Sequence, residues 1–380
     1  MSHPISRQHQ LLLLAAVMLA MLFAGLNPRA YRFSNQATWL ESGTGITFSP
    51  YATAFTEPFL TQELARRFAN DGFSLELALS GLANPQRKFA LITHLYAGED
   101  QAQLVLGQWK NVLIMMNGDD YENRFQTSRI GMRLPDDIEG DHIVTITSGK
   151  GGTRMYLDGT MRTSQPDLKL SMPASPGNGR LIVGNSVHGT RPWHGTIHGL
   201  ALYPETLDEQ TLQRHHQQWR KTGHFSFAQS ETPFTLYTFD EQEGATAHDR
   251  SVHHNHLHLP KRDVIVKKQF LQAQLHKVRI RWSFLVDVGL NLLGFIPFGL
   301  LLSSILHQLG IRGRQRLVMV TTAAVLFSFS IEWVQVWLPS RTSSSLDLVL
   351  NGLGGTLGAL TFERFTSAWN TRNPGRSGKR

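Results

Sequence analysis

Three apolar segments near the C-terminal end constrain the fold of this chain more than any other feature. They cover residues 283–306, 317–338 and 346–362. Each is close to the roughly 20 residues that a helix needs to cross a bilayer. The sequence therefore predicts a helical membrane domain over residues 283–365, followed by a basic tail at 366–380.

A fourth apolar run, residues 11–26, follows the short basic start at residues 1–10. A cleaved signal peptide is the alternative interpretation, because the apolar core is short. However, the run is followed by Asn-Pro-Arg at residues 27–29, which is not a small-x-small cleavage site. We therefore expect an uncleaved first span, which makes a four-span bundle.

Polar residues recur at matching places inside the three C-terminal segments. Their spacing of three or four residues puts each pair on one helix face. Ionisable groups in a membrane span are costly and usually face a protein interior or a wet cavity. With the loop residue Arg341 as counter-charge, they predict one polar membrane site made of Asp287, Asn291, Glu332, Gln335, Arg341, Asp347 and Asn351. The alternative is that these groups only hold helices together.

The net charge of +8 arises largely from cations beside the apolar segments. The positive-inside rule explains their placement without nucleic acid, and we predict no nucleic-acid partner. It puts residues 1–10, the basic stretch 312–316 and the tail in the cytoplasm, and residues 27–281 outside. The cations at 262–281 argue mildly against that orientation. We expect a multi-pass protein of a bacterial inner membrane.

Residues 30–230 consist of many short apolar stretches separated by turn residues, such as 89–96, 102–109 and 142–148. Regular spacing of this kind favours an all-β jelly-roll sandwich. Residues 207–221 have acidic residues early and basic residues late, which favours a helix. The chain has no cysteine, so disulfides and thiolate sites are excluded, and burial must hold an extracytoplasmic domain at 30–260 together.

The end of this stretch resembles the laminin-G/concanavalin-A-like jelly rolls. The resemblance lies in Tyr156–Gly159, Gly179–Asn185 and Trp193–Tyr203. It implies the fold but not the ligand, because this fold is found in lectins, glycosidases and adhesion modules. Residues 231–260 resemble the opening strand of the same family. The sequence leaves open whether they complete the sandwich or form a vestigial repeat.

The membrane segments resemble the VanZ-like family. The resemblance covers residues 283–360 and lies in Asp287, Asn291, the stretch Phe295–Gly299, Ile331–Gln335, Pro339–Arg341, Asp347–Gly352, Gly355 and Gly358. It implies a small four-span membrane protein with the jelly roll inserted after the first span. The family is named for a protein associated with teicoplanin resistance, and the resemblance implies no enzymatic activity. Gly354, Gly355 and Gly358 suit close helix packing.

Aromatic residues in the predicted sandwich are candidates for stacking on sugar rings. We single out Trp109, Tyr121 and Trp193 as weak candidate glycan contacts, although burial in the core is more typical of such side chains.

Two other clusters contain residue types that could form a site. The alternation at His254, His256 and His258 would put three imidazoles on one side of a strand, but the stretch is polar and rich in turns, and we predict no metal. The carboxylates at 137–141 lie in a predicted loop, and the E-x-D-x-x-E strand of jelly-roll glycosidases is absent. We therefore predict neither a catalytic residue nor a cofactor.

Together these patterns predict a multidomain membrane protein, with an extracytoplasmic jelly roll and a four-span bundle. Our hypothesis is a non-enzymatic protein that binds a cell-envelope glycan or glycolipid, contacts membrane lipid and affects glycopeptide susceptibility. The alternative is an enzyme or transporter that acts on a lipid-linked envelope precursor at the charged cluster. A structural scaffold is the third class.

Overall fold

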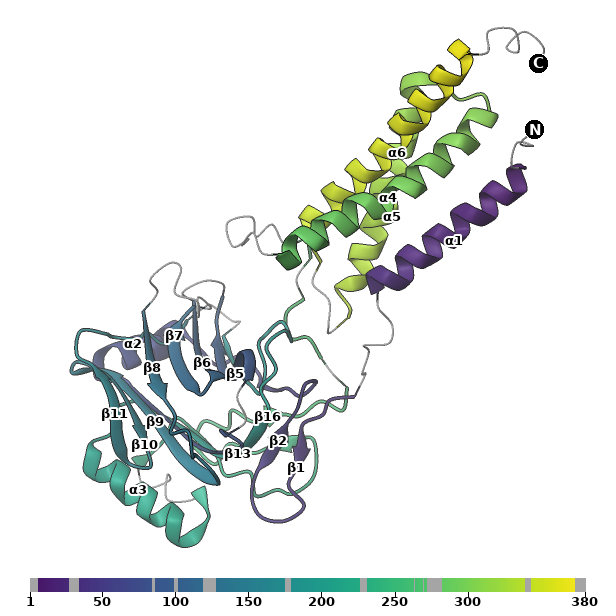
Figure 1. The fold of residues 1–380 in the computed structure, drawn as a ribbon. Helices are drawn as coiled ribbons and strands as arrows, with labels where there is room; N and C mark the ends of the chain where they lie inside the picture. The colour runs from purple at the N-terminus through teal and green to yellow at the C-terminus, as the bar shows by residue number, and fades with distance from the viewer. Residues whose placement is uncertain are drawn as a thin grey trace. The chain divides into compact units, whose positions relative to one another are not determined.

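The computed structural model describes residues 6–26, 34–83, 86–98, 102–118, 128–174, 179–225, 231–262, 264–268, 270–271, 282–338 and 343–372. The chain divides into two compact units (Figure 1). The helical unit consists of Met1–Tyr31 with Lys268–Arg380, and the sandwich unit is Arg32–Lys267. The sandwich is thus inserted after the first helix, as the sequence predicts.

The helical unit contains α1 (Arg7–Leu26), α4 (Trp282–Gln308), α5 (Gly313–Gln335) and α6 (Ser345–Arg372). Among the described residues, α1, α4 over Phe284–Gln308 and α5 are long and apolar enough to cross a membrane. Helix α6 is long enough, but its four glycines and its polar residues lower its mean hydropathy. The prediction of four spans therefore stays a prediction.

Glycines bring α4 and α6 into backbone contact. A Cβ added to Gly354 would lie 2.2 Å from the carbonyl oxygen of Leu292, and one added to Gly358 would lie 2.3 Å from that of Ile296. A Cβ on Gly299 of α4 would likewise lie 2.1 Å from the carbonyl oxygen of Gly355. Such small residues let two helices approach closely. The contacts advance in the same order along both helices, from Leu292 with Gly354 to Ile296 with Gly358, so α4 and α6 run in the same direction.

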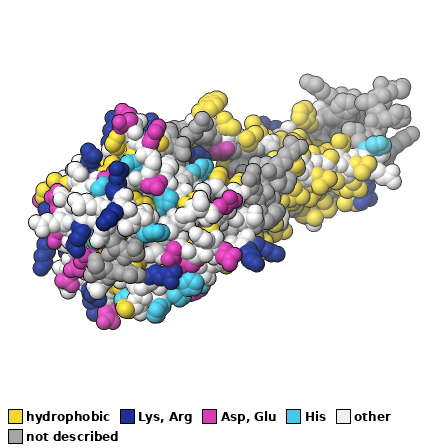
Figure 2. All heavy atoms as spheres, turned by 90° about the horizontal axis from the view of Figure 1, so that it is seen from below, with side chains coloured by type: hydrophobic (Ala, Val, Ile, Leu, Met, Phe, Trp, Pro, Cys, Tyr) yellow, Lys and Arg dark blue, Asp and Glu magenta, His cyan; other side chains and the backbone are white. Residues whose placement is uncertain are grey.

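Large apolar side chains cover the outside of the helical unit, as Figure 2 shows for one face. Leu290 on α4, Leu326 on α5 and Phe365 on α6 are 67%, 63% and 71% exposed. This is the surface expected of helices whose surroundings are lipid tails. Two amide contacts attach α1 to its neighbours: Gln335 Nε2 donates to the carbonyl of Gly25, and Gln308 Nε2 donates to Gln10 Oε1.

The sandwich unit consists of two antiparallel sheets, which confirms the predicted all-β fold (Figure 1). The first sheet has the order β1 (Thr38–Trp39), β2 (Ile46–Phe48), β13 (Gly195–Tyr203), β4 (Phe73–Ser80), β9 (Asp141–Gly149), β10 (Gly152–Leu157) and β11 (Thr160–Gln165), and β14 (Thr235–Tyr237) pairs with β13. The second has the order β15 (Thr246–Ala247), β16 (Leu257–His258), β3 (Ala54–Thr56), β12 (Arg180–Val183), β5 (Gln86–Tyr96), β6 (Gln103–Lys110), β7 (Val112–Asn117) and β8 (Arg129–Arg133).

Residues 231–260 complete the sandwich, which settles the question that the sequence left open. Strand β14 pairs with β13, and β16 pairs with β3. The Asp249 carboxylate, 3% exposed, accepts hydrogen bonds from the amides of Leu236, Ser251 and Asn255 at 2.8–2.9 Å. This one side chain therefore orders the turn between β15 and β16 and connects it to β14. An isolated bridge between Ser34 and Arg262 joins the two ends of the domain.

Two helices accompany the sheets. Helix α2 (Gln62–Asp71) begins at the N-cap Thr61. The predicted helix is α3 (Glu209–Thr222), whose N-cap Asp208 accepts from the amide of Thr211.

Helix α3 is attached to the first sheet by a buried ion pair. Nδ1 of His215 lies 3.0 Å from Oε2 of Glu76, and both side chains are 0% exposed. Tyr203 and Thr145 also donate to Glu76. Burial, followed by the charge of Glu76, raises the pKa of Tyr203 well above its ordinary value. Glu76 thus has the hydrogen-bond partners that a buried carboxylate needs.

A second ion pair makes the stability of the sandwich depend on pH. Nδ1 of His142 lies 2.7 Å from Oδ2 of Asp158, and this hydrogen bond is the main cause that raises the pKa of His142. Burial alone would raise the pKa of Asp158, but hydrogen bonds from His142 and from the amide of Ile143 lower it. The pair therefore stabilises the fold fully between the ordinary pKa values of 3.8 and 6.5.

We expect the melting temperature of the isolated sandwich to fall as the pH rises through the raised pKa of His142. It should also fall as the pH drops through the lowered pKa of Asp158. Asp158→Asn keeps a residue that tolerates the φ of 54° and can still accept from Ile143, but it removes the charge. The melting temperatures at about pH 6 and about pH 9 should differ less in this variant than in the wild-type sandwich. An equal difference in both proteins would contradict the assignment.

Candidate functional site

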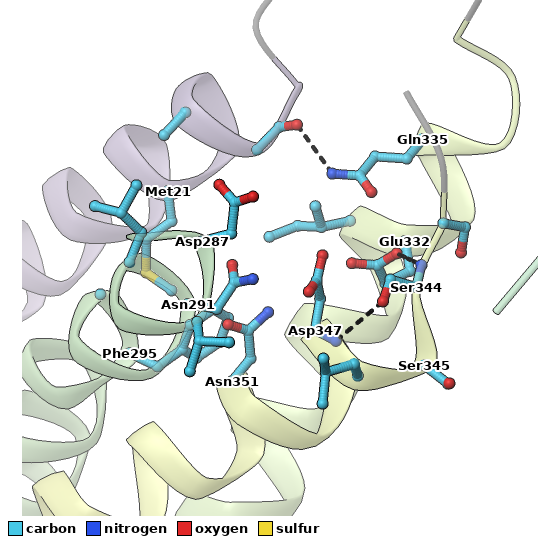
Figure 3. A pocket seen from close by; sticks show the side chains of 18 of the residues that line it. Met21, Asp287, Asn291, Phe295, Glu332, Gln335, Ser344, Ser345, Asp347 and Asn351 are labelled. Atoms are coloured by element: carbon cyan, nitrogen blue, oxygen red, sulfur yellow. Dashed lines mark hydrogen bonds between the residues drawn. The ribbon is translucent and has the colours of Figure 1, made fainter. Parts of the chain in front are cut away.

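The helical unit contains an open cavity of about 820 Å³ whose walls come from α1, α4, α5 and the start of α6 (Figure 3). Six of the seven residues predicted for the polar membrane site line it: Asp287, Asn291, Glu332, Gln335, Asp347 and Asn351. The seventh, Arg341, lies outside the described residues. The three polar pairs thus surround one space, although they are up to 64 residues apart in the chain.

Two of the pairs come from parallel helices. Asp287 and Asn291 are one turn apart on α4, and Asp347 and Asn351 are one turn apart on α6. Because the glycine contacts hold α4 against α6, the two Asp-x-x-x-Asn pairs converge on the same space (Figure 3). The same sequence pattern therefore supplies an acid and an amide from each side of the cavity.

The third pair, on α5, is attached to the start of α6. Glu332 is 2% exposed, and its Oε2 accepts a hydrogen bond of 2.7 Å from the amide of Ser344. Ser344 Oγ in turn accepts from the amide of Asp347 at 3.4 Å, as an N-cap does. Ser344 was not among the predicted site residues, although Ser-x-x-Asp before an apolar run is a capping signal that marks it. This short chain of contacts positions Asp347 next to Glu332.

The cavity is rich in hydrogen-bond acceptors. Asp347 interacts electrostatically with both Asp287 and Glu332, between which Figure 3 places it. Within the described part of the chain, no group donates a hydrogen bond to the carboxylates of Asp287 or Asp347. Asn351 donates through Nδ2 to Ser328, but its Oδ1 is buried without a hydrogen-bond partner. These free acceptors can bind a molecule that carries hydroxyl or ammonium groups.

The rest of the cavity wall is largely apolar. Helix α1 contributes side chains that the sequence analysis did not assign to any site, namely Val17, Ala20, Met21 and Ala24. Phe284, Phe295 and Pro297 of α4 continue this wall. No polar residue in this part of α1 marks it as part of a site, so pattern alone could not have found it. An apolar wall beside a few polar groups is the usual lining of a ligand pocket, and the volume lies within the usual range of about 300–1,000 Å³.

A second polar cluster lies in the same unit. Arg316, predicted in a cytoplasmic loop, is instead in α5 and only 5% exposed. Its guanidinium donates to Glu363 at 3.0 Å and to Nδ1 of His307 at 2.9 Å. The reason for the difference is that α5 begins at Gly313, earlier than the apolar run suggests. The cluster joins α4, α5 and α6 and leaves Arg316 with a paired charge.

The candidate glycan contacts differ in their exposure to solvent. Trp193 is 0% exposed and donates through Nε1 to Gln108, so neither face of its ring is open to a sugar, and this assignment is wrong. Its ring fills the core between the sheets. Trp109 is 39% exposed, with Lys110 Nζ 4.8 Å from the ring centroid. Tyr121 lies outside the described residues.

The sandwich has a polar hollow of about 590 Å³ that the sequence analysis did not predict. Its lining combines both signs of charge, from Arg67, Lys150, Asp71 and Glu205. These residues come from α2, from the turn between β9 and β10 and from the loop after β13. Because they are distant in sequence, no local motif connects them.

Of the alternating histidines at 254, 256 and 258, the last two have structural roles in the sandwich. His256 Nδ1 accepts from the amide of Asp249 at 3.1 Å, and His258 belongs to β16. Of the residues that the structure describes, no group of three His, Asp or Glu side chains is arranged to hold a metal ion. In the 137–141 stretch, Asp141 contacts His198 at 3.4 Å.

The apolar helical unit and the inserted sandwich define a two-domain membrane protein. Comparison with known families adds that residues 209–366 match the VanZ/LLP1 family model. Residues 65–213 match the model of the concanavalin A-like lectin/glucanase superfamily. The chain therefore combines a concanavalin A-like sandwich with a VanZ-like membrane domain. No curated protein matches it.

Similar solved structures include a proposed carbohydrate-binding protein from Bacteroides ovatus, with 15% identity and a TM-score of 0.36. The alignment covers 58% of this chain and 61% of that one. The receptor-binding domain of botulinum neurotoxin D has 11% identity and a TM-score of 0.35, with 49% and 47% covered. The CBM40 module of a Ruminococcus gnavus sialidase, bound to α2,3-sialyllactose, has 12% identity and a TM-score of 0.31, with 47% and 95% covered. This chain thus spans less than two thirds of the first two structures.

Proposed function

We propose that this protein is a non-enzymatic cell-envelope protein whose membrane domain binds the head group of a glycolipid. The observation that carries the proposal is the cavity of about 820 Å³ with acidic and amide side chains on one part of its wall and apolar side chains on another. Carboxylates accept hydrogen bonds from sugar hydroxyls, and the apolar wall of α1 suits the start of an acyl chain.

The sandwich extends the proposal to glycans outside the membrane. Its family match is to a lectin and glucanase superfamily, and the polar hollow lined by Arg67, Asp71 and Glu205 has the size of a ligand site. We propose that the protein lies in a bacterial inner membrane with this domain extracytoplasmic, as the distribution of basic residues favours. The VanZ match supports an effect on susceptibility to glycopeptides of the teicoplanin type.

An enzyme or transporter is the second candidate. It is favoured by the two neighbouring carboxyl groups of Glu332 and Asp347, which lie close enough to interact inside the cavity. Two carboxyl groups in different surroundings can serve as a general acid and a general base. On this alternative the bound lipid-linked precursor would be converted or moved rather than only held.

Two glycines of α4 give a matched test of binding. An added Cβ meets no atom within 4 Å at either Gly294 or Gly289, but only Gly294 lines the cavity. We expect Gly294→Leu to fill the cavity, and to lower the glycolipid that co-purifies with the full-length protein by about tenfold, the equivalent of about 1.4 kcal/mol. Gly289→Leu should retain the lipid. Native mass spectrometry of both variants, at matched abundance, measures the difference.

Equal glycolipid in the two variants would contradict head-group binding in this cavity. A bound lipid whose mass changes during incubation with the wild-type protein, but not with Glu332→Gln, would favour the enzyme instead. A strain that expresses Gly294→Leu should also match the deletion strain in teicoplanin susceptibility, whereas Gly289→Leu should match the wild type.

A further inference from the structure

We propose that the cavity selects lipids whose head group carries a primary ammonium, such as an amino sugar, over neutral or anionic head groups that lack one. This inference rests on the proposed function and names the ligand class of the same site. The group bound would lie between Asp287 on α4 and the pair Asp347 and Asn351 on α6.

The first support is the set of free acceptors. The carboxylates of Asp287 and Asp347 receive no hydrogen bond from any described residue. Asn351 is only 5% exposed, yet its Oδ1 lacks a hydrogen-bond partner and its side chain lines the cavity. A buried polar atom without a partner is costly, so a donor from a ligand at this wall would be favoured. An ammonium has three N–H donors, one for each of these three acceptors.

The second support is charge. Asp287, Asp347 and Glu332 place three carboxyl groups around one space, with Asp347 interacting with each of the other two. Among the described residues that line the cavity there is no cationic side chain. An anionic phosphate would meet repulsion here. A neutral hydroxyl would relieve none of the repulsion between the carboxylates, whereas an ammonium relieves it with charge-assisted hydrogen bonds.

The third support is size and shape. A bare metal ion is surrounded by its ligands at distances of about 2.0–2.6 Å. This cavity has a volume of about 820 Å³ and is therefore far larger than a metal ion needs. Its apolar wall on α1, including Val17 and Met21, would contact hydrocarbon rather than water. A lipid with an ammonium on its head group matches both parts of the lining.

The test compares two lipids that differ at one position. Full-length protein is placed in nanodiscs of phosphatidylglycerol with equal amounts of glucosaminyl-diacylglycerol and glucosyl-diacylglycerol, and the retained lipids are counted by native mass spectrometry. We expect the amino lipid to be retained about tenfold more than the neutral one, the equivalent of about 1.4 kcal/mol. Asp347→Asn should bring the ratio close to one. Asp167→Asn, an exposed carboxylate of the sandwich, should not change it.

The outcomes separate this inference from the function on which it rests. Equal retention of both sugars by the wild-type protein would overturn the ammonium inference and leave glycolipid binding in place. Retention of neither lipid would overturn both. In a further arm, phosphatidylethanolamine replaces the amino sugar lipid. If phosphatidylethanolamine is retained and the amino sugar lipid is not, the ammonium inference stands and the glycolipid proposal falls. If each of these two amine lipids is retained in its own arm, the ammonium is sufficient for binding, whether a sugar or a phosphate carries it.

Discussion

Replacing Gly358 by valine is expected to remove most of the full-length protein from the membrane fraction. The added Cβ would lie 2.3 Å from the carbonyl oxygen of Ile296 and 2.8 Å from the amide nitrogen of Leu300. Both obstacles are backbone atoms, so no side chain can move to make room. Helices α4 and α6 would have to separate by about 1 Å, at a loss of about 3 kcal/mol or more.

The matched control is Gly289→Val, in α4, where an added Cβ meets no atom within 4 Å. Both changes introduce the same β-branched side chain into a helix, so any loss of helix propensity is shared. Quantitative blotting of membranes and melting temperatures in detergent measure the difference. If the two variants accumulate equally, the α4–α6 contact is not what holds the cavity together.

Replacing Gly184 by valine is expected to unfold the sandwich. Gly184 follows β12 with a φ of 80°, a left-handed conformation that costs a residue with a side chain about 1–2 kcal/mol. Its Cβ would also lie 2.0 Å from Cδ1 of Phe48, a core ring that is 1% exposed. Hydrogen bonds to Ile92 and Trp193 prevent the glycine backbone from moving away. Together these effects approach the total stability of a domain, about 5–15 kcal/mol.

Gly131→Val in β8 is the matched control. Its added Cβ has its nearest neighbour at 3.6 Å, an ordinary contact, and valine suits a strand. Circular dichroism of Arg32–Lys267 should show cooperative melting for Gly131→Val and no folded baseline for Gly184→Val. A folded Gly184→Val domain would show that Phe48 and the turn can rearrange.

The sequence indicated the polar cavity residues because helical periodicity is a local property. Asp287 with Asn291 and Asp347 with Asn351 share a face by spacing alone, and the structure places both pairs at one cavity. The contribution of α1 was not predictable, because Val17 and Met21 look like any other lipid-facing residues. Its place depends on packing between segments more than 250 residues apart in the chain.

Burial was harder to predict than secondary structure. Trp109 lies in β6 and Trp193 just before β13, and packing in the core rather than residue type decides that Trp193 is buried and Trp109 partly exposed. Arg316 illustrates the same difficulty. Its sequence neighbours suggest a basic loop, but Glu363, which pairs with it, lies 47 residues further along the chain.

The bridge between Ser34 and Arg262 bears on how such a domain arrangement can evolve. Because the sandwich begins and ends at adjacent points, such a domain can be inserted between two consecutive elements of another domain. A gene segment that encodes such a domain can be gained, lost or exchanged as one cassette without rerouting the helices on either side. The helical unit and the sandwich can therefore evolve at different rates, because either one can change without altering the path of the other.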